Sequence, residues 1–299
     1  MNNGRATPLI SSVCYVRLAV SEPSASARFV SDIFGLQRVA DQDGEIAFRS
    51  DDRFRTVSLG HEAPDGESVG IEVWDDEALR EIGQRLREAG FTAREATAGE
   101  CRRRYVQSSL MAEDASGNRI DLVVRPTRSG RRCFPARDAG IVAFHGVGLR
   151  TTDHVRDLAF WRALGAEVSD WVGDIAYVRI DGLHHRVALY PSKRNGILYA
   201  AFEVEALDQL MQNSYFMQES QIRVVQGPGR EPASRQMFLH VEGPDGLIFS
   251  YVNGMATFDG KPRLARQFPL TATSLCDWGS ESKDVPELGA AVEMRRRSA

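Results

Sequence analysis

Alternating apolar and polar residues, followed by helical periodicity, occur twice in the same order along this chain. Residues 15–36 (YVRLAVSEPSASARFVSDIFGL) and 146–166 (GVGLRTTDHVRDLAFWRALGA) each predict a strand, a polar turn and a helix. A glycine, Gly35 or Gly165, follows each helical stretch, where a left-handed helix stop is favoured. This repeat predicts two copies of one supersecondary unit.

The similarity between the two halves continues downstream. Residues 45–60 and 174–190 both predict two strands joined by an aspartate-containing turn. Residues 70–91 and 201–220 both predict a strand followed by a helix, and a glycine-containing turn with a final strand closes each copy. The early segments are offset by about 131 residues, which indicates a duplicated βαβββ unit.

These patterns predict an α+β fold made of two modules, an intervening connector and an extension. We expect the first module at residues 12–126, without a functional site, and a basic linker at 127–139. The second module, at 140–256, is expected to carry the pocket. The C-terminal extension covers 257–299, and we expect its end to be disordered.

Charge and composition exclude several classes of partner. The net charge of −4 over 299 residues gives no general attraction for nucleic acid or for an anionic membrane surface. No apolar run approaches the roughly 18 residues needed to cross a bilayer, and the N-terminus lacks a signal-peptide core. We therefore expect a soluble cytoplasmic protein. The four cysteines form no Cys-x-x-Cys pair, which favours reduced structural thiols over disulfides or a zinc site.

Several phrases, in order, resemble proteins of the vicinal oxygen chelate superfamily, which includes glyoxalases, bleomycin resistance proteins and dioxygenases. Among them are "FEVEALD", "GPGR", "EGPDG" and "FPLTATSLCDWG". Over roughly residues 12–279 the chain is similar to the two-module type I extradiol catechol dioxygenases. The resemblance implies paired modules that form two cupped sheets, a small aromatic substrate and a homo-oligomer. It also implies ring cleavage with Fe(II) or Mn(II), held by two histidines and a glutamate.

The positions that match the family's three metal ligands carry other residues. The first ligand lies three residues before the leucine of a "His-Val-x-Leu" strand, and counting back from Leu149 gives Gly146. His145 has the opposite strand parity, so alternation predicts its imidazole on the other face. The other two ligand positions hold Tyr199 and Ser250. Because a phenol with a pKa near 10 is a poor Fe(II) ligand, we predict that the metal triad is lost and that no cofactor is bound.

Other titratable residues match functional places in the family. His184 or His185 corresponds to a histidine near the dioxygen side of the metal, and alternation allows only one of them to face inward. The sequence pattern favours His185, whereas the spacing to Tyr199 leaves His184 open.

Glu231 follows "GPGR", where the family has a histidine, and His240 replaces a tyrosine. We expect the histidines to act as acid or base, Tyr199 as a hydrogen-bond donor or proton relay, and Glu231 as an orienting group or general base. The predicted catalytic residues are His184, His185, His240, Tyr199 and Glu231, and the predicted pocket lining is Gly146, Ser250, Trp171, Tyr177, Phe202, Phe238 and Tyr251.

Three functions follow from these positions. The first is a metal-independent enzyme that uses acid/base chemistry, of isomerase, lyase, cyclase or hydrolase type, on a phenolic or polycyclic aromatic molecule. The second keeps the family's activity, an Fe(II)-dependent ring-cleaving dioxygenase whose ligands have moved to His145, His184, His185, Glu231 or His240. The third is a protein that binds aromatic ligands without chemistry.

Overall fold

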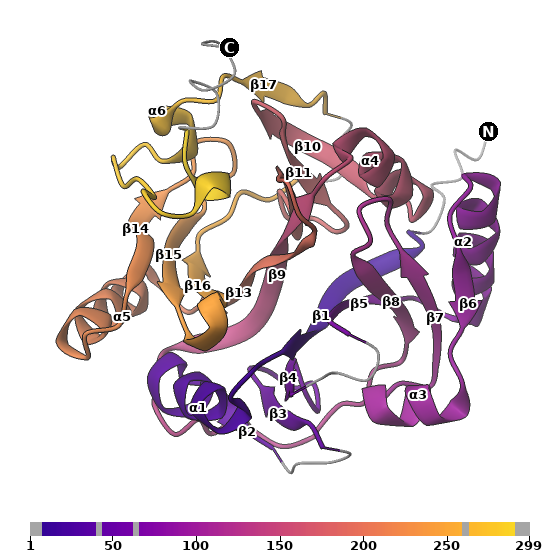
Figure 1. Ribbon diagram of the computed structural model, residues 1–299, viewed down its shortest axis with the longest axis horizontal. Helices are drawn as coiled ribbons and strands as arrows, with labels where there is room; N and C mark the ends of the chain where they lie inside the picture. The colour runs from indigo at the N-terminus through magenta and orange to yellow at the C-terminus, as the bar shows by residue number, and fades with distance from the viewer. Residues whose placement is uncertain (1–7, 40–43, 62–65, 259–262, 291–299) are drawn as a thin grey trace.

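The computed structural model describes residues 8–39, 44–61, 66–258 and 263–290, so the predicted disordered end at 291–299 lies outside the described residues. Two mixed sheets organise the chain (Figure 1). The first contains, in spatial order, β2 (Gln37–Arg38), β3 (Ile46–Arg49), β4 (Val57–Gly60), β1 (Ile10–Ala19), β5 (Ser68–Val73), β8 (Arg119–Val124), β7 (Ser108–Glu113) and β6 (Ala93–Glu95).

The second sheet repeats this order and adds one strand. It contains β14 (Val224–Arg230), β15 (Met237–Glu242), β16 (Ile248–Asn253), β13 (Gly196–Val204), β9 (Ile141–Thr151), β12 (Val187–Pro191), β11 (Ile175–Arg179), β10 (Glu167–Val172) and β17 (Arg266–Phe268). In each sheet the two βαβββ units meet where their first strands pair antiparallel, β1 with β5 and β9 with β13. The predicted α+β fold of duplicated βαβββ modules is confirmed.

The helices connect these strands. They are α1 (Pro23–Arg28) with its π-helical continuation η1 (Phe29–Phe34), α2 (Asp76–Glu88), α3 (Ala98–Arg104), α4 (His154–Ala163), α5 (Leu207–Glu219) and α6 (Ala272–Leu275), with short 3-10 turns η2 (Pro244–Gly246) and η3 (Pro286–Leu288). Among the described helices, none is long and apolar enough to span a membrane.

Side chains of the second sheet separate into two clusters, one on each face, because they alternate along the strands. On one face, Phe202 and Phe249 pack against Phe34 of η1, which belongs to the first module by sequence. On the other face, the cluster around Tyr199 includes Leu275 of α6, in the C-terminal extension. We call this second face the cup. Figure 1 shows the extension, drawn in yellow, lying over it, and β17 pairs parallel with β10 at the sheet edge.

The corresponding face of the first sheet is filled by buried polar groups. The Asp121 carboxylate accepts hydrogen bonds from Tyr15 Oη at 2.9 Å and from Arg104 Nε at 2.9 Å. Nearby, Glu45 accepts from Arg55 Nη1 at 3.2 Å. All five side chains are buried. Because partners surround these charges, their arrangement is explained by the stability of the module.

Candidate functional site

Five of the predicted site residues share the cup face of the second sheet. Tyr177, Tyr199 and Phe238 belong to the cup cluster. His240 on β15 lies between two of them, with ring centroids 5.0 Å from Tyr199 and 4.8 Å from Phe238. Ser250 on β16 is the cross-strand partner of His240. The chain thus brings these residues together from four strands.

Three residues predicted to line the pocket lie on the opposite face, so these predictions were wrong. Phe202 and Tyr251 pack beneath η1, and the Tyr251 hydroxyl donates to the Phe34 carbonyl oxygen at 2.7 Å. Trp171 packs against the same helix-side cluster. The reason is strand alternation: Ser250 faces the cup, so its neighbour Tyr251 faces away.

A β-bulge in β9 corrects the prediction for His145. Ala201 pairs with Gly146, but the next residue of β13 pairs with Phe144, so His145 is an extra residue that resets the alternation. His145 Nδ1 lies 3.8 Å from Oε2 of Glu203, which shares strand parity with Ala201 of the cup cluster. The imidazole therefore reaches the cup side, contrary to the parity argument.

Gly146 does not line a pocket either. A Cβ atom at this position would lie 2.2 Å from the carbonyl oxygen of Arg186, so the backbone just before β12 closes the space beside it. The glycine is needed for this close approach of two strands.

His184 and His185 both face the cup side, which corrects the expectation that alternation admits only one. They lie in the connection between β11 and β12, where strand parity does not apply. The rings lie 5.6 Å and 4.5 Å from the ring of Tyr177, respectively, measured between centroids. His184 Nε2 lies 2.8 Å from Asp170 Oδ2, and His184 Nδ1 lies 3.1 Å from His185 Nδ1.

These contacts fix the protons on both rings. Burial lowers the pKa of His184, which Asp170 partly opposes, and burial lowers the pKa of His185 well below its usual value, so both are neutral at pH 7. Because the Asp170 carboxylate accepts, His184 carries its hydrogen on Nε2 and accepts at Nδ1. His185 then donates from Nδ1 and keeps a lone pair on Nε2. His184 is thus a positioning residue, and His185 is the histidine that retains a basic nitrogen.

Asp170 is the buried anion of this group. Burial by itself would raise the pKa of its carboxyl, but hydrogen bonds from His184, Arg266 and Arg263 outweigh burial and hold it below its ordinary value. Arg263 Nη2 lies 2.9 Å from Oδ1, and Arg266 Nη2 lies 2.6 Å from Oδ2. Neither Asp170 nor the two arginines were predicted as site residues, because none of them belongs to a phrase that resembles the family.

Glu231 has the environment of an acid/base group. Burial raises the pKa of its carboxyl to about 7, although hydrogen bonds with Ser234 and Tyr177 act in the opposite direction. Tyr177 is also within hydrogen-bond reach of Tyr190, whose hydroxyl lies 3.4 Å from that of Tyr199. A line of hydroxyl groups therefore connects Glu231 with the deeper cup. Burial raises the pKa of all three tyrosines well above 10, so they remain protonated donors.

His240 and Ser250 carry buried polar atoms without a partner. Among the described residues, none bonds His240 Nδ1 or Ser250 Oγ, although both side chains are buried. Burial lowers the pKa of His240 to about 3, so the ring stays neutral at physiological pH. This ring therefore does not exchange a proton near neutral pH, contrary to the expectation that His240 acts as an acid or base. A buried pair of this kind needs a water molecule or a polar atom of a ligand.

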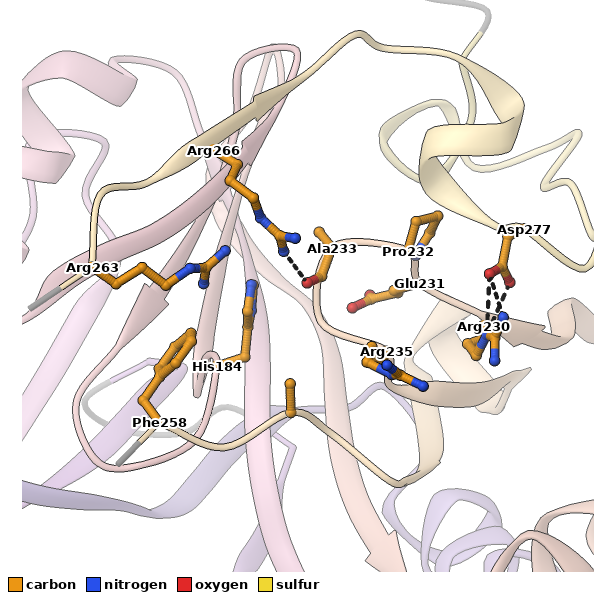
Figure 2. Close-up of a pocket in the computed structure, with 11 residues that line it drawn as sticks. His184, Arg230, Glu231, Pro232, Ala233, Arg235, Phe258, Arg263, Arg266 and Asp277 are labelled. Atoms are coloured by element: carbon orange, nitrogen blue, oxygen red, sulfur yellow. Dashed lines mark hydrogen bonds and ion pairs between the residues drawn. The ribbon is translucent and has the colours of Figure 1, made fainter. Parts of the chain in front are cut away.

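A cavity of about 490 Å³ opens beside Glu231 and His184, and its lining does not include His240 or Ser250 (Figure 2). Glu231 and His184 lie at its wall, together with Phe258, and arginines surround them. This volume is within the range of small-molecule sites. The remaining lining residues are Arg230, Pro232, Ala233, Arg235, Ala256, Arg263, Arg266 and Asp277.

The side chains at the matched ligand positions do not fit the iron of extradiol dioxygenases. Gly146 offers no donor, Ser250 offers a hydroxyl group, and Tyr199 is a protonated phenol in contact with Tyr190. An Fe(II) facial triad requires two imidazoles and a carboxylate. His145 and Glu203 lie on the cup side, but no group of three possible metal-binding side chains is found within the described ranges.

The pKa of Glu231 predicts a pH-dependent contribution to stability. Its pKa of about 7 in the folded state lies above the ordinary value of 4.5, so the folded state binds the extra proton between these values. The contribution is present below about pH 4.5 and is lost as pH rises through 7, a change of about 3 kcal/mol. Urea denaturation of wild type and Glu231→Gln should therefore give a difference in unfolding free energy that falls across this window. The protonation of His240 contributes equally to both proteins, so it cancels in this comparison. A difference in unfolding free energy that does not change with pH would contradict the raised pKa of Glu231.

Comparison with known proteins shows the fold and a similarity to one superfamily. Residues 143–251 match the model of the Glyoxalase/Bleomycin resistance protein/Dioxygenase superfamily. The chain is 25% identical to 3-methylcatechol 2,3-dioxygenase of Pseudomonas putida over 79% of this chain and 87% of that protein. It is 24% identical to an iron-dependent extradiol dioxygenase of Rhodococcus jostii over 91% and 97% of the two chains.

Solved structures share the fold at low sequence identity. An extradiol ring-cleaving dioxygenase from B. fuscum aligns with a TM-score of 0.81 and 20% identity, over 94% of this chain and 82% of that one. A Mn(II)-bound glyoxalase from Novosphingobium aromaticivorans aligns with a TM-score of 0.80 and 19% identity, over 94% of each chain. The chain thus has the two-module fold of these solved structures and is similar to extradiol dioxygenases, and its residues 143–251 match the Glyoxalase/Bleomycin resistance protein/Dioxygenase superfamily.

Proposed function

We propose that this protein is an enzyme that transfers protons on a phenolic or polycyclic aromatic molecule held at the C-terminal cup, without the iron that its relatives use. The observation that carries the proposal is Glu231, a buried carboxyl with a pKa of about 7 at the wall of a 490 Å³ cavity. A group that is partly protonated at neutral pH both removes and returns a proton efficiently.

The chemistry follows from the residues beside Glu231. The Glu231 carboxylate takes a proton from a carbon or oxygen atom of the substrate, and the resulting carboxylic acid returns a proton at another atom. This is an isomerisation, or the proton-transfer part of a lyase reaction, and it needs no further reactant. The protonated hydroxyl group of Tyr177 stabilises ionised Glu231 by a hydrogen bond, and Tyr190 and Tyr199 continue this line of hydroxyl groups behind it. The lone pair on His185 Nε2 is a second base.

Solvent deuterium exchange tests the proposal before the physiological substrate is known. The protein is incubated in D₂O with hydroxylated naphthalenes and naphthoates, and deuterium incorporation at carbon is followed by mass spectrometry. The proposal predicts exchange or turnover that the protein accelerates over buffer after treatment with a metal chelator. Tight binding of these compounds without any accelerated exchange or turnover would instead indicate a binding protein.

Iron-dependent ring cleavage is the second candidate, and the names of the relatives favour it. Both curated relatives described above are named as dioxygenases, and one of them as iron-dependent. One structural observation also supports it: the bulge in β9 brings His145 close to Glu203 on the cup side. An anaerobic Fe(II) titration followed by a catechol ring-cleavage assay distinguishes the two candidates. We also keep self-association, as a homo-oligomer, as a proposal.

A further inference from the structure

The cavity beside Glu231 carries more cationic than anionic groups. The Arg230 Nη2 atom lies 2.7 Å from Asp277 Oδ2, which balances that arginine. Arg263 and Arg266 share one carboxylate, Asp170, so the cluster of these three side chains keeps a net positive charge. The lining therefore favours an anion.

Arg235 adds a second uncompensated charge. Its side chain is exposed at the cavity, and within the described part of the chain no carboxylate pairs with its guanidinium. Arg235 has a φ of 63°, a left-handed conformation that is uncommon for a residue with a side chain. Its N–H donates to the Glu231 carbonyl oxygen at 2.8 Å, which ties the loop to the acid/base residue. Backbone strain of this kind persists where the surroundings hold it and is frequent at functional sites.

An aromatic surface lies on the other side of the cavity. The Arg263 guanidinium carbon lies 4.9 Å from the centroid of the Phe258 ring, and the His184 ring lies 5.8 Å from it. Figure 2 shows Phe258 and Arg263 on one side of the cavity, and Arg235 and Glu231 across from them. A flat ligand ring in contact with Phe258 would thus lie in the same cavity as the guanidinium groups of Arg235 and Arg263.

We propose that the substrate is an aromatic carboxylate, whose ring contacts Phe258 and whose carboxylate binds Arg235 and Arg263. This inference rests on the proposed function, because it names the substrate class of the same site. Counted over the described residues, Arg235 and the Asp170 cluster leave a surplus of about two positive charges, which partly ionised Glu231 reduces. This surplus matches a singly charged group better than a doubly charged phosphate ester. Arginine is suited to a planar carboxylate because its fork of N–H donors matches the two oxygens.

Binding of three probes tests the inference. Isothermal titration calorimetry compares 2-naphthoic acid, its neutral amide 2-naphthamide, and 2-naphthyl phosphate at low ionic strength. The wild-type protein should bind the acid about tenfold more tightly than the amide, as one charge-assisted contact predicts. It should also bind the acid more tightly than the phosphate, and Arg235→Gln should remove the advantage of the acid while changing amide affinity less than about twofold.

Arg131→Gln is the matched control, because Arg131 is exposed on the connector and away from the cavity. This variant should bind all three probes as wild type does. Equal affinities for acid and amide, unaffected by Arg235→Gln, would overturn the carboxylate inference and leave the role of Glu231 untouched. Tighter binding of the phosphate would overturn it as well. Failure of the proposed function is a separate result, the absence of accelerated deuterium exchange.

Discussion

Glu231→Gln is expected to lower deuterium exchange or turnover of an aromatic substrate by about 10²–10⁴-fold, the usual contribution of a general acid or base. The amide keeps the size of the side chain and its hydrogen-bonding neighbours, Ser234 and Tyr177, but it exchanges no proton near neutral pH. The wild-type rate should increase through about pH 7 as the carboxyl ionises, if proton removal limits the rate.

Glu219→Gln is the control for this substitution. Glu219 is exposed at the end of α5, so its replacement should leave the rate unchanged. Equal activity of wild type and Glu231→Gln, at unchanged substrate affinity, would show that another residue performs the proton transfer.

Asp121→Ala is expected to destabilise the protein by about 3–5 kcal/mol, because it leaves a buried arginine without its carboxylate. Asp121 and Arg104 are both almost fully buried, and their closest atoms, Oδ2 and Nε, lie 2.9 Å apart. The substitution also removes the acceptor of the Tyr15 hydroxyl group. Urea denaturation measures the loss.

Asp174→Ala provides the comparison, since Asp174 is exposed in the turn between β10 and β11. Its effect should stay within about 0.5 kcal/mol. A loss below about 1 kcal/mol for Asp121→Ala would mean that the polar cluster of the first module is solvated.

The topology of both sheets was predictable from the sequence because its signals are local. Strand alternation, helical periodicity and glycine stops recur in the two halves, and each βαβββ unit folds its own copy of that pattern. Tyr199, His240 and Ser250, which the resemblance to the family placed at the site, share one face of the second sheet. Their matched positions in the family supplied the register.

Other parts of the site depend on contacts between distant segments. The bulge at His145 arises from the pairing of β9 with β13, and the neighbouring residues carry no sequence signal that predicts it. Asp170 meets Arg263 and Arg266 through the parallel pairing of β10 with β17, more than ninety residues apart. The position of Tyr190 was predictable from strand alternation. It lies two residues after Ala188, so both side chains belong to the same face of β12 and to the cup cluster.

At the matched ligand positions the backbone, as well as the side chains, does not fit an iron site of the extradiol type. A side chain at Gly146 would collide with the Arg186 carbonyl oxygen, and the Tyr199 ring lies where a Cβ on Gly148 would be, 2.4 Å from its nearest atom. A histidine at position 146 would therefore require β9 to move away from the backbone just before β12. The cup instead presents a neutral histidine, protonated tyrosines and one carboxyl that titrates near pH 7.

Fe(II) binding under anaerobic conditions tests the central claim most directly. Equilibrium dialysis against micromolar Fe(II) is followed by measurement of the iron bound to each chain, for wild type and for His145→Ala and His185→Ala. The account predicts iron far below one per chain, the same in all three proteins, and no ring cleavage of added catechol. One iron per chain that is lost in both variants, together with ring-cleavage activity, would contradict it.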